Sequence, residues 1–133
     1  MPKNSYLPAI GRRKRAVARV RLIKGKESMT VNGLAAERYF PLAVSQKLLF
    51  ESLVLTDLAE KYTATIKVLG SGRISQLLAI RHGLARAIVK LDSDKFKTIL
   101  KSAGLLTRDS RKRQRRHIGT GGKARRRKQS PKR

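Results

Sequence analysis

The chain has 133 residues, of which 33 are Lys or Arg and 8 are Asp or Glu, so its formal net charge is +25 at pH 7. The absence of Cys excludes disulfides, thiolate nucleophiles and Cys-ligated metal sites, and no apolar run approaches the roughly 18 residues of a membrane span. Apolar residues make up 40% of the chain, which is enough for a hydrophobic core. The first residues lack the apolar stretch of a signal peptide, so we expect an intracellular protein with no membrane partner.

The N-terminal residues alternate between apolar and polar side chains, which is typical of strands. We predict a short strand over residues 5–10 and a second over 16–23, with Ala18, Val20 and Leu22 on one face. Residues 24–26 contain a glycine and are expected to turn the chain. A short return strand containing Met29 and Val31 would then form a hairpin with residues 16–23. Asn32-Gly33 predicts a tight turn, since both residue types tolerate positive φ.

In the middle of the chain, the spacing of apolar residues changes first to a helical period and then back to alternation. Residues 34–39 are predicted to form a helical turn that ends at Pro41, and residues 42–53 to form a helix. Val44, Leu48 and Leu49 are expected to share its apolar face. Residues 62–68 alternate again, which predicts another strand that ends at the turn Gly70-Ser71-Gly72.

Two further helices complete the expected fold. Residues 74–91 repeat Leu77, Leu84, Ile88 and Leu91 at spacings of seven, four and three, which is typical of an amphipathic helix. Asp92 or Ser93 is expected to cap another helix of about ten residues, with Phe96, Ile99 and Leu100 in it and Gly104 closing it. These elements predict an α+β fold, a small sheet packed with helices.

The last part of the chain differs sharply in composition. Residues 107–133 hold 13 Lys or Arg, one acid (Asp109) and few apolar side chains. Such a segment buries too little apolar surface to offset an ordering cost of roughly 1–2 kcal/mol per residue. We therefore expect a globular domain over 1–106 and an extended basic tail over 107–133.

A charge of +25 requires a polyanionic partner. Arg outnumbers Lys nine to four in the tail, which favours phosphate, because guanidinium makes forked hydrogen bonds. The lack of Cys excludes zinc fingers, and the few aromatic residues are not clustered as in a base-stacking sheet. These observations favour RNA over DNA without deciding between them.

Local clusters of cations mark candidate contacts. The run Arg12 to Arg15 lies between two predicted strands, where it either binds phosphate or is a solvated loop. Gly70-Ser71-Gly72 is interpreted as the turn that joins a strand to the following helix, and Arg73 as a phosphate contact. Gly83, in mid-helix, indicates close approach by RNA or another chain element. His82 is expected to bond RNA or backbone, since the globular part offers no second His or Cys for a metal.

Five blocks of sequence then resemble one family. Residues 11–20, 31–33, 39–41, 79–87 and 104–111 are similar, in order and spacing, to the small-subunit ribosomal protein nine family of bacterial and organellar type. The resemblance covers nearly the whole chain. It implies the ribosomal-type fold with a left-handed β-α-β crossover. It also implies a place in the head of the small subunit, among neighbouring ribosomal proteins, bound to 16S-type ribosomal RNA.

The resemblance also implies the site residues. Lys132 and Arg133 match the family's final Lys-Arg, which reaches the anticodon stem-loop of transfer RNA in the peptidyl site. Contacts with ribosomal RNA are expected from the following cations and histidine: Arg12, Arg13, Lys14, Arg15, Arg73, Arg81, His82, Arg108, Arg111, Lys112, Arg113, Arg115, Arg116, Lys123, Arg125, Arg126, Arg127 and Lys128.

The expected function is therefore a structural one in translation, in a cytoplasmic or an organellar ribosome, with no cofactor, no metal, no catalytic residue and no small-molecule substrate. A DNA-compacting protein is the first alternative, since the charge alone would permit it. An RNA-processing nuclease is the second. It would need clustered carboxylates, and the eight acids are scattered along the chain without a metal-type spacing.

Overall fold

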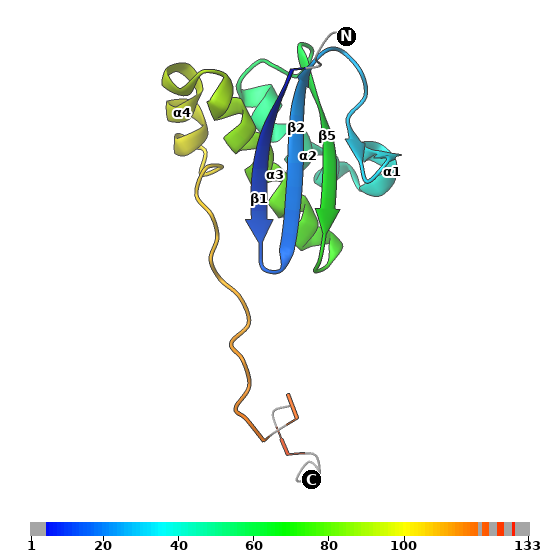
Figure 1. Cartoon of the computed structure of the whole chain (residues 1–133), viewed down its shortest axis with the longest axis vertical. Helices are drawn as coiled ribbons and strands as arrows, with labels where there is room; N and C mark the ends of the chain where they lie inside the picture. The colour runs from blue at the N-terminus through cyan, green and yellow to red at the C-terminus, as the bar shows by residue number, and fades with distance from the viewer. Residues whose placement is uncertain (1–4, 120, 123–124, 127–128, 130–133) are drawn as a thin grey trace.

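The computed structural model describes residues 5–119, 121–122, 125–126 and 129 (Figure 1). Within them, a five-stranded sheet is packed against helices, which confirms the predicted α+β class. The elements in chain order are β1 (Tyr6–Arg13), β2 (Ala16–Lys24), β3 (Thr30–Val31), β4 (Leu34–Ala35), α1 (Ala36–Tyr39), α2 (Ala43–Leu55), β5 (Tyr62–Leu69), α3 (Arg73–Leu91) and α4 (Ser93–Ser102). None of the helices in this part of the chain could span a membrane.

The sheet has the strand order β1-β2-β5-β3-β4. β1 and β2 form an antiparallel hairpin whose register places Arg13 opposite Ala16, and β5 lies antiparallel along the other side of β2. β3 runs parallel to β5, and the chain between these two strands includes α1 and α2. The sheet therefore contains a β-α-β unit, the kind of connection that parallel strands require.

The predicted hairpin between residues 16–23 and the strand near Met29 and Val31 is wrong. β2 pairs on one side with β1 and on the other with β5, over eight residue pairs each, whereas β3 pairs with β4 and β5. β3 has only two residues, so it offers far fewer ladder hydrogen bonds to β2 than β5 does. The turn at Asn32-Gly33 is confirmed, with φ of 52° and 81°, and it joins β3 to β4.

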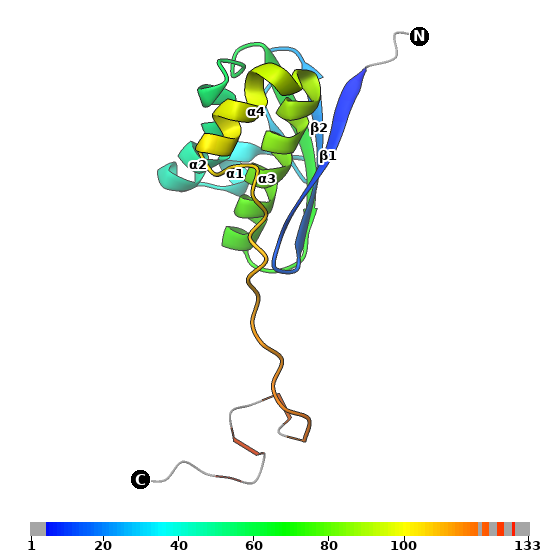
Figure 2. The ribbon, with the colours of Figure 1, turned by 90° about the vertical axis from the view of Figure 1, so that its left-hand side faces the viewer.

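The core lies between one face of the sheet and the helices. Ala18, Val20 and Leu22 of β2 are buried, as predicted, and alternate with residues of the other face. Figure 2 shows the helices gathered on one side of the sheet, with its other side uncovered. The predicted apolar stripe of α3 is confirmed at Leu77, Leu84 and Ile88, all buried.

Two glycines allow β1 and α3 to approach closely. An ideal Cβ on Gly11 would lie 1.9 Å from the carbonyl oxygen of Ala79 and 2.3 Å from the backbone nitrogen of Gly83. A Cβ on Gly83 would lie 2.8 Å from Cγ2 of Val20. The inference that Gly83 marks close approach is therefore confirmed, and the approaching elements are β2, through Val20, and β1, whose Gly11 backbone nitrogen would lie 3.0 Å from the same Cβ.

The shorter helices follow the sequence with two exceptions, of which the first is that residues 34–35, predicted as part of a helical turn over 34–39, form strand β4, so α1 begins at Ala36. Asp92 caps α4 by accepting a hydrogen bond from the Lys95 backbone N–H, and Gly104 takes a left-handed φ of 76° just after the helix. The expectation that Val44 lies on the apolar face of α2 is wrong, because its side chain is 71% exposed. Leu49, predicted on the same face, is buried, as is Leu53 four residues later, and both lie on the face toward α3.

Candidate nucleic-acid interface

The loop between β1 and β2 presents cations at one end of the sheet. Only Lys14 and Arg15 lie between the paired residues Arg13 and Ala16, so the turn is tight, and Lys14 adopts a φ of 52°. Arg12, Lys14 and Arg15 are exposed, whereas the Arg13 side chain is only 12% exposed. The run of four cations is thus divided into three solvent-facing side chains and one that is turned inward.

The loop between β5 and α3 lies beside this turn. A Cβ on Gly70 would lie 2.5 Å from the backbone oxygen of Arg15, and the φ of Gly70 is 87°, so both contact and conformation require glycine here. Arg73 follows at the start of α3. Its guanidinium lies 4.2 Å from the ring centroid of Tyr39 and donates a hydrogen bond to the Tyr39 backbone oxygen. Arg73 is exposed but already held within the chain.

The start of the tail is fixed to the globular part by several contacts, and we call residues 105–111 the tail root. Leu105 is buried in the core, and Nε2 of His82 donates to the backbone oxygen of Leu106. A guanidinium nitrogen of Arg13 lies 3.3 Å from the Asp109 carboxylate, and another donates to the Arg111 backbone oxygen at 2.7 Å. The inward-turned Arg13 therefore holds the tail root.

The electrostatics of the tail root follow from these contacts. Hydrogen bonds from the side chain and backbone N–H of Arg111, assisted by Coulomb attraction to Arg111 and Arg13, hold the pKa of the Asp109 carboxyl well below its ordinary value. Burial lowers the pKa of His82, an effect that the hydrogen bond to Leu106 opposes and that the charges of Arg86 and Arg108 increase. His82 is therefore mostly neutral at pH 7.

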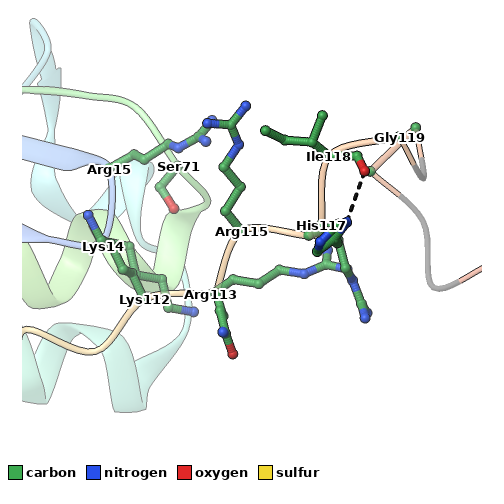
Figure 3. Close-up of a pocket in the computed structure, with 13 residues that line it drawn as sticks. Lys14, Arg15, Ser71, Lys112, Arg113, Arg115, His117, Ile118 and Gly119 are labelled. Atoms are coloured by element: carbon green, nitrogen blue, oxygen red, sulfur yellow. Dashed lines mark hydrogen bonds between the residues drawn. The ribbon is translucent and has the colours of Figure 1, made fainter.

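Beyond the root, the described tail runs away from the sheet with no helix or strand, in the same direction as the β1–β2 turn (Figures 1 and 2). A pocket of about 1130 Å³ lies between this tail and the two loops, and we call it the cationic groove. Lys14, Arg15 and Ser71 line it from the loops, and it is lined from the tail by residues 112–119, 121 and 122. Figure 3 shows the side chains of Arg15 and Arg115 converging across it.

The lining of the groove contains no acidic residue. Two unit charges 4 Å apart repel by roughly 1 kcal/mol even in bulk water, and by more near a protein surface. Such a concentration of cations attracts an anion that can meet several of them at once, and a chain of phosphates has the required repeat of charge. The groove can therefore bind a nucleic-acid backbone without reading its bases.

The other expected site residues are distributed unevenly. Arg81 points to α2, where its Nε donates to Glu51 at 2.7 Å, so it links two helices. Arg111 is exposed but paired with Asp109. The remaining described tail cations are exposed: Arg108, Lys112, Arg113, Arg115, Arg116, Arg125 and Arg126. Lys123, Arg127, Lys128, Lys132 and Arg133 lie outside the described residues.

Two cations of α3 are not among the RNA contacts expected from the sequence. Arg86 and Lys90 line a second pocket together with Arg12, His82 and Arg108. Their spacing of four from His82 to Arg86 and from Arg86 to Lys90 places all three on one side of a helix, and this was the signal available in the sequence. Among the described residues, no group of three His, Asp or Glu could hold a metal ion.

Comparison with known proteins identifies close relatives. The model of the family described as Ribosomal protein S9/S16 matches residues 11–133. A protein of Maridesulfovibrio salexigens named Small ribosomal subunit protein uS9 is 44% identical over 114 residues, which cover 86% of this chain and 87% of that protein. The protein of the same name from Dehalococcoides mccartyi is 44% identical over 117 residues, 88% of each chain.

Proposed function

Because the chain belongs to the ribosomal protein S9/S16 family, whose members are structural constituents of the small ribosomal subunit and not enzymes, we propose that it binds the RNA of that subunit through its cationic groove and tail. Membership confirms the resemblance found in the sequence and excludes the nuclease alternative. Both relatives are bacterial, which supports a place on a cytoplasmic ribosome.

The observation that carries the proposal is the acid-free lining of the cationic groove. The tight β1–β2 loop contributes Lys14 and Arg15, the β5–α3 loop contributes Ser71, and the tail contributes cations on a backbone that is extended and exposed. This combination suits RNA that is already folded, because the rigid loops meet one segment of backbone while the tail follows the space between helices. In this arrangement the tail root sets the direction of the tail, since Arg13 and Asp109 fix its first residues.

The same proposal assigns Lys132 and Arg133 to the anticodon stem-loop of transfer RNA in the peptidyl site. Support comes from the family's final Lys-Arg, which this chain shares, and from the course of the described tail away from the globular part. Pro131 precedes the pair and supplies no backbone N–H, so the donors for this contact come from Lys132 and Arg133.

Truncation of the tail tests the RNA contact. A chain cut after Arg111 keeps the tail root but lacks 11 Lys or Arg of the full chain. Each phosphate that is no longer neutralised lowers the slope of log K against log salt by about 0.7–0.9, so we expect weaker binding to small-subunit RNA and a slope reduced by several. An unchanged slope would contradict the proposal.

Two further measurements separate the finer parts. Removing residues 130–133 should leave subunit assembly intact while transfer RNA binds less tightly in the peptidyl site; unaltered transfer-RNA binding would contradict the role of Lys132 and Arg133.

Footprinting addresses the DNA-compacting alternative. We expect protection confined to particular helices of small-subunit RNA, whereas uniform coating of duplex DNA with equal affinity would favour that alternative.

A further inference from the structure

A second cationic pocket lies where strand β1 meets helix α3, and we call it the seam pocket. It has a volume of about 530 Å³ and is lined by Arg12, His82, Arg86, Lys90 and Arg108, with Pro8, Ala9 and Ile10 of β1 as its remaining wall. It shares no lining residue with the cationic groove. The seam pocket is therefore separate from the groove, and Arg108 of the tail root is the one tail residue in its lining.

Two of its cations are fixed by the strand beside them. Arg86 donates a hydrogen bond to the backbone oxygen of Ile10 at 2.6 Å, and the ammonium group of Lys90 donates to the backbone oxygen of Pro8. A guanidinium has five N–H donors and an ammonium three, so each side chain keeps donors for another acceptor. The hydrogen bonds thus position the charges without using up their capacity to bind an anion.

The charge of the seam pocket is not balanced from within. Its lining contains no acid, while Arg12, Arg86, Lys90 and Arg108 come from three different parts of the chain. The acid of the tail root, Asp109, is paired with Arg13 and Arg111. Because like charges that converge without a counter-charge repel one another, an external anion stabilises this arrangement.

The shape and chemistry of the lining narrow the choice of anion. A volume of about 530 Å³ is in the range of pockets that hold a small organic ligand, so it accepts a sugar–phosphate unit and not only a bare ion. The lining has no Phe, Tyr or Trp on which a base could stack, and its one imidazole, His82, is bonded to the backbone oxygen of Leu106. These features suit the backbone of a nucleic acid, which supplies charge and needs no base recognition.

We propose that the seam pocket binds a backbone phosphate of small-subunit ribosomal RNA, with Arg86 and Lys90 as the contacts that sequence reasoning missed. This rests on the proposed function, since the RNA is the same, but it places a second stretch of that RNA beside β1. The globular domain and the tail root then bind RNA at the seam independently of the cationic groove.

A pair of charge-matched variants tests the seam pocket. Arg86→Gln with Lys90→Gln removes two charges while keeping amide donors near the β1 carbonyls. Lys97→Gln with Lys101→Gln removes two exposed charges of α4 outside both pockets. Full chains are titrated against small-subunit ribosomal RNA transcript at several salt concentrations. We expect the seam variant to bind at least about tenfold more weakly, with a salt slope smaller by about 0.7–0.9 for the one phosphate that is lost, and the α4 variant to change much less. Equal effects in the two variants would overturn the proposal.

A second measurement uses the unaltered chain, so it does not depend on how the variants fold. Lysine acylation followed by mass spectrometry compares the free chain with its complex with the RNA transcript. We expect protection of Lys90 in the complex, with Lys97 and Lys101 still reactive. Equal reactivity of Lys90 in both states would refute the seam contact while leaving the groove untouched. The proposed function itself would fail differently, through binding of ribosomal RNA no tighter than duplex DNA of equal length.

Discussion

Substitution of Gly11 by Ala gives the most direct test of how the fold is held together. The added Cβ would lie 1.9 Å from the Ala79 oxygen, and an ordinary contact is 3.4 Å or more, so β1 and α3 must separate by about 1.5 Å. Both colliding groups are backbone, so no rotamer change relieves the contact. Overpacking in cores costs about 1–3 kcal/mol when side chains can adjust, and here we expect at least about 3 kcal/mol.

The assay is urea unfolding of the full chain followed by far-ultraviolet circular dichroism. Gly72→Ala is the matched control, because a Cβ there meets nothing within 4 Å and the φ of Gly72 is −90°. We expect the control to lower the free energy of unfolding by less than about 1 kcal/mol, as for an ordinary N-cap position. If Gly11→Ala cost no more than the control, the close approach of β1 and α3 would be refuted.

Three single contacts give the remaining predictions. Because burial lowers the pKa of His82, its imidazole binds a proton more readily in the unfolded chain than in the folded one. The free energy of unfolding should therefore fall as the pH drops below about 6.5, and His82→Gln should lessen that fall in urea titrations at pH 7 and pH 5. Asn32 exchanges two hydrogen bonds with the backbone of Val68, so Asn32→Ala should cost about 1–3 kcal/mol in the same assay, and a neutral result would contradict the role of this side chain. Asp109→Asn should increase backbone motion over residues 109–113 in nitrogen-15 relaxation. In the unaltered chain, acid should have the same effect only well below pH 3.8, since the pKa of Asp109 is lowered in the folded chain. Identical relaxation in the variant and the unaltered chain would show that Asp109 does not fix the tail root.

The sequence predicted those elements whose pattern is local. The alternation of Ala18, Val20 and Leu22, the period of α3 and the Asn32-Gly33 turn each depend on neighbours within a few residues. Strand pairing is a non-local property. Nothing near Met29 shows that β5, more than thirty residues later in the chain, takes the place beside β2. The prediction for Val44 is wrong for a related reason, since the apolar residues of α2 lie around much of the helix and do not define a single face until its partners are known.

The residues of the candidate site also divide into those that the local sequence predicts and those that depend on the fold. The exposed cations of the β1–β2 turn could be selected from their density, and the family resemblance located the tail contacts. The inward role of Arg13 could not be predicted from the run Arg12 to Arg15, because nothing in four consecutive cations shows which side chain the strand and turn direct inward. Likewise, Arg86 and Lys90 line a pocket only because β1 lies beside α3, and this packing is not visible in the sequence.

The hydrogen bonds from Arg86 and Lys90 to β1 also have a consequence for the chain before it joins the subunit. β1 is an edge strand, and an edge with free carbonyls is a template for another strand to add and start aggregation. Pro8 offers no N–H, and the carbonyls of Pro8 and Ile10 already have partners with positive charge. The opposite edge, β4, has only two residues. A newly synthesised chain that has not yet joined the subunit therefore has both edges of its sheet protected against pairing with a strand of another copy.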